Sequence, residues 1–242
     1  MTNTNFLKSY PDHVAGLLKR LGNETALRQA IGGDFVAVGK LEFWLLMSLG
    51  LADGAFLVDI GCGSGRLACQ LAKFEHLRYL GTDVVPELLE YARLLTNRAD
   101  WQFLLTNGVC IPCEDNKADY VASFSVFTHL LHEETYRYFL EANRILKPGG
   151  YLVFSFLEFR IACHWETFIS SVNSTQQGKH LNQFMDRDAI RVWAQRSGFA
   201  EPRIFDGDRG HIPIPEEIQW DNGMKMGTFG NLGQSVAILR KL

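Results

Sequence analysis

The chain has 242 residues, of which 47% are hydrophobic and 21% charged, a balance typical of a globular domain with a sizeable core. Its 24 lysines and arginines and 27 aspartates and glutamates give a net charge of −3, which disfavours a nucleic-acid partner because such partners usually leave a basic footprint. No run is long and apolar enough to span a membrane and the first ten residues are polar, so we expect a soluble, cytoplasmic protein.

Three helices are expected before the first strand. Glycines that stop a helix and an asparagine that can cap one divide this region into segments of helical length. No linker separates these segments from the rest of the chain, so they predict an N-terminal helical cap over residues 1–50 of a single domain that covers residues 1–242. The expected helices cover residues 10–21, 24–31 and 39–49.

From residue 56 onward, short apolar runs alternate with segments of helical periodicity. Such alternation is typical of a parallel sheet with helices on both faces, and continuous apolar strands fit burial on both sides. Residues 51–157 are therefore expected to form the core of the domain, with the ligand at the carboxyl ends of the strands. The expected strands cover residues 56–60, 78–82, 101–105, 120–125 and 151–156, and the helices between them cover residues 65–74, 86–97 and 133–146.

The pattern weakens after residue 156. Residues 186–197 have helical periodicity, and residues 200–205 and 234–239 are apolar runs that predict an antiparallel hairpin at one edge of the sheet. Two other segments lack clear periodicity, and the second holds five glycines and two prolines and is expected to be mostly loop. They are residues 158–185, with a loop expected at 170–179, and residues 206–232.

The most informative stretch follows the first expected strand. Residues 56–67 read F-L-V-D-I-G-C-G-S-G-R-L, an apolar run and an acid followed by glycines at alternate positions and then a helical pattern. A loop with almost no side chains lets a ligand approach the backbone and the helix N-terminus. A dinucleotide site needs the spacing G-x-G-x-x-G, and counted from Gly61 its third glycine falls at Arg66, which disfavours a nicotinamide oxidoreductase.

The spacing G-x-G-x-G, with Asp59 two residues before the first glycine, resembles the first motif of the class I S-adenosylmethionine-dependent methyltransferases. The resemblance covers about residues 32–156, and more loosely residues 197–239. It implies a three-layer Rossmann-like α/β fold with a mostly parallel seven-stranded sheet whose last strand is antiparallel. It also implies S-adenosylmethionine as the cofactor and S-adenosylhomocysteine as the product. The other matching motifs, in order, are Asp83, Thr106-Asn107-Gly108, Asp119 with residues 123–130, and residues 146–150.

The cofactor that the resemblance implies is a zwitterion with an adenosine and a sulfonium. Backbone N–H groups of the glycine loop can meet its carboxylate, and Asp59 is placed to hold its amino group. Asp83 can accept both ribose hydroxyls, because an ionised carboxylate only accepts. Asn107 stands where the family usually has aspartate, so it is either an uncharged acceptor for the adenine amino group or a turn residue. The expected cofactor-binding residues are Asp59, Gly61, Cys62, Gly63, Gly65, Asp83, Val84, Asn107, Gly108 and Ser125.

Methyl transfer needs an aligned acceptor and, for a hydroxyl, a base that removes its proton. A histidine titrates near neutrality, so His129, after the fourth strand, is the candidate base, and bracing of the next helix is its alternative role. No cluster with metal-ligand spacing is found, so no metal is expected. The segments at 158–185 and 206–232 are expected to form acceptor-site lids. Other candidate bases are His132, Glu158, His164 and His211, and candidates for an apolar acceptor wall are Trp165, Phe168 and Trp220.

Cys110 and Cys113 form a C-x-x-C pair that stands alone. A zinc site would need further ligands, and a thioredoxin-like role would need a different strand–helix setting. We therefore interpret them as semi-buried thiols. An odd number of cysteines, five, in a chain of this length does not indicate a disulfide framework.

The sequence predicts a methyltransferase that modifies an oxygen or nitrogen of a small molecule, such as a sugar, lipid or secondary metabolite. The acidic balance and the lid-sized extra segments favour this acceptor class. The sequence does not predict the oligomeric state. A first alternative is a protein or nucleic-acid methyltransferase, which is disfavoured because no Asn-Pro-Pro-Tyr-type tetrad follows the fourth strand. A second alternative is a non-catalytic sensor that binds S-adenosylmethionine.

Overall fold

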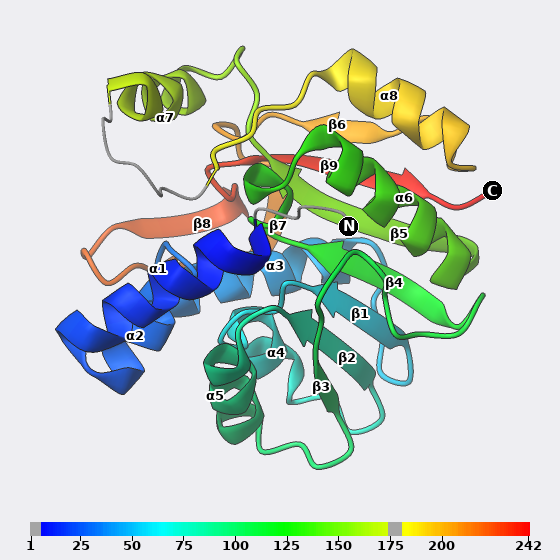
Figure 1. Cartoon of the computed structure of the whole chain (residues 1–242). Coiled ribbons are helices and arrows are strands. Elements are labelled where there is room, and N and C mark those ends of the chain that lie inside the picture. Colours follow the sequence, from blue (N-terminus) through cyan, green and yellow to red (C-terminus); the bar gives the residue numbers. More distant parts are fainter. Residues whose placement is uncertain (1–5, 174–180) are drawn as a thin grey trace.

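The computed structural model describes residues 6–173 and 181–242, so most of the loop expected at 170–179 lies outside the described residues. Its centre is a seven-stranded sheet in the order β3-β2-β1-β4-β5-β9-β6 (Figure 1). All strand pairs are parallel except those of β9, which runs antiparallel to both of its neighbours. This confirms the predicted fold class. The strands are β1 (Phe56–Ile60), β2 (Arg78–Asp83), β3 (Gln102–Leu105), β4 (Ala118–Ser123), β5 (Leu146–Phe156), β6 (Arg203–Phe205) and β9 (Ser235–Arg240).

Helices cover both faces of the sheet, because the central strands are apolar on both sides. In β1, the fully buried Leu57 packs into one core cluster and the fully buried Val58 into the other. The first cluster includes side chains of α3, α4 and α5, and the second includes side chains of α6 and α8. These helices are α3 (Phe35–Ser48), α4 (Arg66–Leu71), α5 (Pro86–Thr96), α6 (His132–Ile145) and α8 (Arg187–Arg196), with a 3-10 turn, η1 (Phe127–His129), before α6.

The N-terminal helices α1 (Phe6–Leu21) and α2 (Asn23–Ala30) lie beside the carboxyl ends of the central strands (Figure 1). They pack on α5 through a separate apolar cluster that includes Val85 and Leu88. Helix α3 begins four residues earlier than expected, because the Asp34 side chain caps it by accepting hydrogen bonds from the N–H groups of Val36 and Ala37 at 3.0 and 2.8 Å.

Two differences from the expected elements lie in the late part of the chain. Residues 206–232, expected to be mostly loop, contain the antiparallel pair β7 (Ile212–Gln219) and β8 (Lys225–Gly230). The isoleucines of β7 are buried against α3. This burial favours the strand although prolines lie beside the isoleucines. The weakly patterned segment after β5 contains α7 (Ala162–Asn173), in which His164 is the buried residue.

The ends of several elements also differ from the expected ranges. Helix α1 already begins at Phe6, whose ring is buried in the core, and it contains Pro11. Strand β5 also includes the glycine-containing residues 146–150, which precede the expected strand, and a register shift against β4 accommodates them. No helix in the described ranges, 6–173 and 181–242, has the length and hydrophobicity needed to cross a membrane.

Candidate active site

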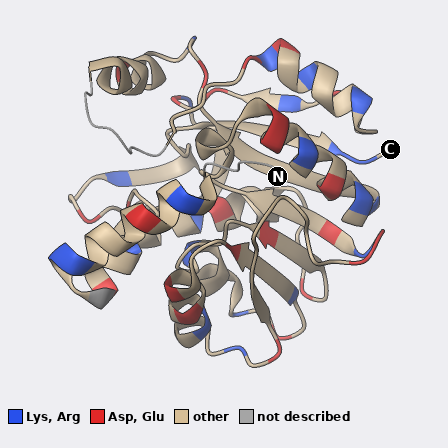
Figure 2. Ribbon diagram, in the orientation of Figure 1, with Lys and Arg blue, Asp and Glu red and all other residues tan. Residues whose placement is uncertain are grey.

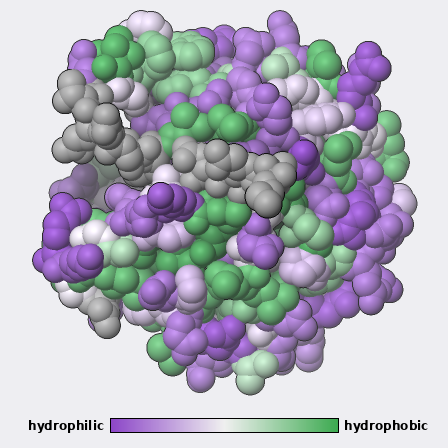
Figure 3. Space-filling model, in the orientation of Figure 1, coloured by the Kyte–Doolittle hydropathy of each residue, from purple (hydrophilic) through white to green (hydrophobic). Residues whose placement is uncertain are grey.

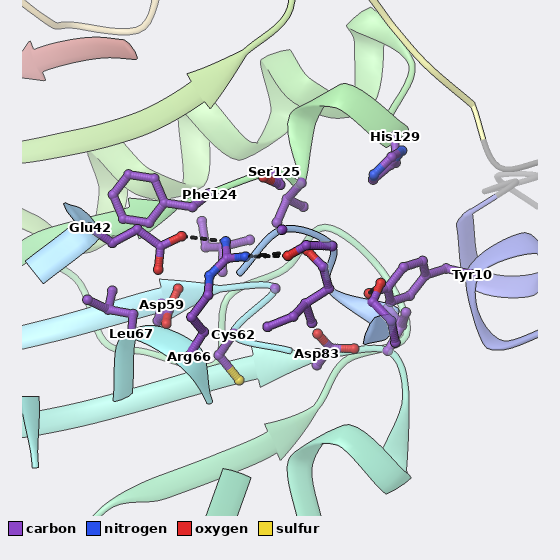
Figure 4. A pocket seen from close by; sticks show the side chains of 18 of the residues that line it. Tyr10, Glu42, Asp59, Cys62, Arg66, Leu67, Asp83, Phe124, Ser125 and His129 are labelled. Carbon is purple, nitrogen blue, oxygen red and sulfur yellow. Dashed lines mark hydrogen bonds and ion pairs between the residues drawn. The ribbon is translucent and has the colours of Figure 1, made fainter. Parts of the chain in front are cut away.

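A cavity of about 400 Å³ lies where β1, β2 and β4 end, between the glycine loop and the N-terminal helices (Figure 4). Phe6 and Tyr10 of α1 and the loop between α2 and α3 close it on one side. It thus brings together segments that are far apart in the sequence. The expected site residues that line this cavity are Asp59, Gly61, Cys62, Asp83, Val84, Ser125 and His129.

The glycine loop is packed so closely that side chains would not fit. A Cβ atom on Gly61 would come within 2.4 Å of Val126, and one on Gly63 within 2.5 Å of Ile31. Both glycines have positive φ, 67° and 54°, which other residues rarely adopt. Gly65 lies against Ala92 of α5 in the same way. The alternate glycines therefore allow close contact with three different parts of the chain, while the Gly61 backbone faces the cavity.

Asp83 ends β2 with both carboxylate oxygens turned to backbone donors. Its Oδ2 accepts the N–H of Gly63 at 2.9 Å, and its Oδ1 accepts the N–H of Val85 at 3.0 Å. Burial raises the pKa of this carboxyl to about 6, while the two N–H groups favour the ionised form. Each oxygen has a second lone pair, so Asp83 holds the glycine loop and can still accept hydrogen bonds from a ligand.

Asp59 is buried in a different way. Its side-chain Oδ2 accepts a hydrogen bond from the Tyr79 hydroxyl at 2.7 Å, and Asp59 is 3% exposed. Within the described residues no basic side chain forms an ion pair with it. Burial raises its pKa to about 8, and the nearby carboxylates of Glu42 and Asp83 act in the same direction. A carboxyl that lines a cavity without a counter-charge suits a cationic ligand group.

Arg66, which stands where a dinucleotide loop would have its third glycine, turns back toward the N-terminal part of the chain. Its Nη2 donates to Glu42 of α3, and its Nη1 donates to the Gly32 carbonyl at 2.9 Å (Figure 4). Both side chains of this ion pair are buried and line the cavity. The arginine therefore links the glycine-loop helix to the N-terminal cap, a role that the sequence pattern did not predict.

At the third strand, the structure places a different residue in the cavity than the sequence indicated. Thr106 lines the cavity, whereas Asn107 is exposed and Gly108 is not among the lining residues. The Gly108 carbonyl accepts hydrogen bonds from the hydroxyls of Thr106 and Tyr138, at 2.8 and 3.2 Å. Asn107 is thus exposed and outside the cavity lining, which motif position alone does not reveal.

Ser125 and His129 border the cavity after β4. Ser125 has a positive φ of 59°, and its N–H donates to the Ser155 hydroxyl at 2.7 Å. The His129 ring nitrogen Nδ1 lies 2.6 Å from the Leu181 carbonyl, which can only accept, so Nδ1 carries the proton. Burial lowers the pKa of His129, so its ring is neutral near pH 7 with Nε2 as the basic nitrogen.

The other candidate bases lie outside the cavity lining. Glu158 is paired with Arg187 of α8, with Nε 2.8 Å from Oε2. His164 contacts the Gly233 carbonyl at 3.0 Å, and His211 stacks on Phe205 with ring centroids 4.8 Å apart. His132 is held by the Phe184 carbonyl and the Gln183 side chain. These contacts brace the segments around β9, α7 and α8 and leave His129 as the candidate that borders the cavity.

The three residues expected to form an acceptor wall also lie elsewhere. Trp165 and Phe168 belong to an aromatic cluster with Phe159 and Phe184, and Phe159 stacks on Phe184 at 4.7 Å. Trp220 packs on the core beside β7. Figure 3 shows hydrophobic atoms at the upper left, where Figure 1 places α7. The aromatic residues that line the cavity are Phe6, Tyr10, Phe124 and Tyr138.

The remaining motif, the C-x-x-C pair, is near the surface. Cys110 is exposed and Cys113 partly buried, and all five cysteines are free. Burial raises the pKa of Cys113, which disfavours a reactive thiolate. Within the described residues, no group of three or more histidines, cysteines or acids is arranged to hold a metal ion.

A sheet of this strand order, with a glycine loop after β1 and an acid at the end of β2, defines the class I methyltransferase fold. Solved structures support this assignment of the fold. With a TM-score of 0.62 and 14% identity, the chain matches magnesium protoporphyrin IX methyltransferase of Synechocystis with bound S-adenosylhomocysteine, covering 98% of this chain and 96% of that one. A methyltransferase of Thermotoga maritima gives a TM-score of 0.62, 20% identity, and coverage of 94% and 99%.

Residues 58–154 match the family model described as a methyltransferase domain. The chain is 28% identical over 184 residues to malonyl-[acyl-carrier protein] O-methyltransferase of Geobacter sulfurreducens, covering 72% of this chain and 67% of that protein. It is 27% identical over 143 residues to the corresponding enzyme of Hahella chejuensis, covering 59% of this chain and 50% of that protein. The ubiquinone biosynthesis O-methyltransferase of Coxiella burnetii is 26% identical over 162 residues, covering 63% and 65%. A third to a half of each relative's length is thus unmatched.

The fold and the matched domain are those of the class I S-adenosylmethionine-dependent methyltransferases, and S-adenosylmethionine is the cofactor. The residues present fit this molecule. The cavity pairs a carboxyl without a counter-charge, Asp59, with a carboxyl that still has free lone pairs, Asp83. The first suits the cationic amino group of a zwitterion, and the second suits the hydroxyls of a ribose.

Proposed function

We propose that this enzyme moves the methyl group of S-adenosylmethionine to an oxygen or nitrogen atom of a small molecule, such as a sugar, lipid or secondary metabolite. The observation that carries this proposal is the position of the cavity. It lies under α1 and the loop that follows α2, with the aromatic rings of Phe6 and Tyr10 in its lining. An acceptor small enough to enter beneath these elements fits such a site better than a folded macromolecule does.

The residues have distinct roles in this proposal. The glycine-loop backbone and the start of α4 receive the methionyl carboxylate, and Asp59 receives the amino group. Asp83 accepts the ribose hydroxyls, and Thr106 lies at the adenine end beside Asn107 and Gly108. Bound S-adenosylmethionine supplies an activated methyl group. The enzyme's own part is to align the acceptor with that group and to exclude water.

His129 is the proposed general base for a hydroxyl acceptor. The Leu181 carbonyl fixes the tautomer of its ring, so that the basic nitrogen is Nε2. A neutral imidazole can take a proton near pH 7. An amine acceptor that arrives deprotonated would need no such base, and His129 would then only orient it.

The charge distribution and the relatives agree with a small acceptor. Figure 2 shows acidic and basic residues interspersed over this face without a basic stripe, and the net charge is −3. Nucleic-acid binding usually requires a basic stripe. The names of the similar proteins refer to malonyl-[acyl-carrier protein] and to ubiquinone biosynthesis. Ubiquinone is a small organic molecule, and malonyl-[acyl-carrier protein] is a small acyl group carried on a protein, so both names support a small methylated group.

Transfer of label tests the proposal. The enzyme is incubated with methyl-labelled S-adenosylmethionine and separately with the small-molecule, protein and nucleic-acid fractions of a cell extract. We expect label in the small-molecule fraction. Label only in protein or nucleic acid would overturn the proposed acceptor class. Absence of transfer to every fraction, with cofactor binding intact, would identify a non-catalytic sensor.

A further inference from the structure

One ionisable group of the cavity lacks a partner of opposite charge in the described part of the chain. Three carboxyl side chains, those of Glu42, Asp59 and Asp83, are buried in the cavity lining beside one guanidinium, that of Arg66. Arg66 is committed to Glu42 and to the Gly32 carbonyl. Asp83 is stabilised by two backbone N–H groups. Among residues 6–173 and 181–242, Asp59 is bonded to neither a cation nor a backbone donor, only to the Tyr79 hydroxyl.

The groups that face Asp59 do not supply the missing positive charge. The groups that act on its carboxyl are Tyr79 and Asp83 of β2, Glu42 of α3 and Arg66 of α4. The Cys62 thiol of the glycine loop is a fifth neighbour, and burial raises its pKa, so it is neutral. The neighbours therefore contribute two carboxylates and one already paired cation. An ionised carboxyl at this position would be costly until a cation arrives.

The position of Asp59 indicates which part of a ligand brings that cation. Figure 4 shows Asp59, Arg66 and Glu42 toward one end of the cavity and Asp83 and Tyr10 toward the other. Asp83 is the proposed ribose partner, so Asp59 lies toward the amino-acid end of the cofactor. This end carries an ammonium group in both S-adenosylmethionine and S-adenosylhomocysteine.

We propose that Asp59 is protonated in the ligand-free enzyme and that the ammonium group of the incoming cofactor or product displaces this proton. The inference rests on the proposed function of the cavity. The proton leaves the carboxyl for the solvent, the carboxylate stays paired with the ammonium, and no covalent bond to carbon or sulfur changes. Recognition of the amino-acid end is then coupled to pH, and the site selects ligands that carry a cation at this position.

Proton release on binding is the direct readout. S-adenosylhomocysteine is titrated calorimetrically into the wild-type enzyme at pH 7 in two buffers with different heats of ionisation. A carboxyl with a pKa of about 8 is about nine-tenths protonated at pH 7, so we expect the release of about 0.9 proton per ligand bound. Asp83, with a pKa of about 6, is already about nine-tenths ionised and adds about 0.1.

Two controls separate Asp59 from other sources of protons. In Asp59→Asn, release should fall to about 0.1 proton per ligand. 5′-Methylthioadenosine shares the adenosine and the thioether but lacks the amino acid, so its binding to wild type should release about as little. Release that persists in Asp59→Asn, or equal release with 5′-methylthioadenosine, would overturn the inference.

A second variant keeps the carboxyl and covers the case in which Asp59→Asn does not fold. Tyr79→Phe removes the hydrogen bond that favours the ionised carboxyl, so we expect weaker S-adenosylhomocysteine binding at pH 7, with most of the loss recovered at pH 8.5. A pH-independent loss would contradict the inference. Binding of S-adenosylhomocysteine without proton release would overturn the inference alone, whereas no binding at all would overturn the proposed function as well.

Discussion

At the scale of single residues, we propose that Thr106, and not Asn107, borders the adenine end of the site. The motif match pointed to Asn107, but its side chain is exposed, and the half-buried Thr106 beside it lines the cavity. We expect Thr106→Leu to crowd the cavity and weaken S-adenosylhomocysteine binding at least about tenfold. Asn107→Leu should change the dissociation constant less than about threefold, since its side chain is exposed and outside the cavity lining. Calorimetric titration of both variants distinguishes them, and a larger effect from Asn107→Leu would favour the motif-based assignment.

His129 is the residue on which the proposed proton removal depends. We expect His129→Gln to lower kcat at least about a hundredfold for a hydroxyl acceptor, because glutamine cannot act as a base. Binding of S-adenosylhomocysteine should stay within about threefold of wild type. His132→Gln is a matched control, because His132 is held by Phe184 and Gln183 outside the cavity lining. Equal turnover by both variants would remove His129 from the mechanism.

At the scale of elements, the site depends on how α3 and α4 are joined. The Arg66–Glu42 pair is 8% and 3% exposed at its two side chains, so loss of one partner leaves a buried charge uncompensated. We expect Glu42→Ala to cost about 3–5 kcal/mol of unfolding free energy in urea denaturation of the ligand-free protein. The double variant Glu42→Leu with Arg66→Met should recover much of that loss, because it removes both charges and keeps volume.

A surface ion pair provides the comparison. Glu217 pairs with Lys225 at 2.8 Å, but both side chains are 58% exposed. Glu217→Ala should therefore cost less than about 1 kcal/mol. A cost for Glu42→Ala as small as this would show that α3 and α4 do not depend on the buried pair.

The elements also show which parts of the fold the sequence predicts. The parallel core was predictable, because its strands are continuous apolar runs between helices with clear periodicity. The β7–β8 pair was missed, because prolines and glycines suggest a loop when the buried partner surface on α3 is unknown. Helix α7 was missed because it buries mainly His164 and so has little of the apolar periodicity that reveals a helix.

At the scale of the whole molecule, the cluster of buried carboxyls makes stability depend on pH. Burial raises the pKa of Asp59 to about 8 and that of Asp83 to about 6, above the value of about 3.9 for an unfolded aspartate. At these two groups the folded state binds more protons than the unfolded state between pH 4 and 8, which lowers the free energy of unfolding as pH rises. Burial lowers the pKa of His13, His129 and His211, and these groups act in the opposite direction below about pH 6.5. Urea denaturation of the ligand-free protein between about pH 6.5 and 8 should therefore show the decline. Asp59→Asn should flatten it, and stability that rises over this range in wild type would contradict the assignment.

Sequence motifs revealed one part of the cavity lining and missed another. The motifs revealed the glycine loop, Asp59 and Asp83. These lie on β1, on the loop after it and at the end of β2, at fixed spacings along the chain. Phe6, Tyr10 and Glu42 were not found, because they reach the cavity by packing of the N-terminal helices and no local pattern encodes that packing. The candidate acceptor-wall residues do not line the cavity, for the same reason. Its candidates were chosen by residue type, and tertiary contacts direct them into other clusters.

The central claim is that the cavity under the N-terminal helices binds S-adenosylmethionine and its demethylated product. Calorimetric titration of S-adenosylhomocysteine, beside NAD, tests it most directly. We expect one molecule bound per chain, no binding of NAD, and a loss of at least about a hundredfold in affinity for Asp83→Ala, with Glu87→Ala, an exposed acid nearby, unchanged. Absence of S-adenosylhomocysteine binding, tight binding of NAD, or unchanged affinity in Asp83→Ala would contradict the account.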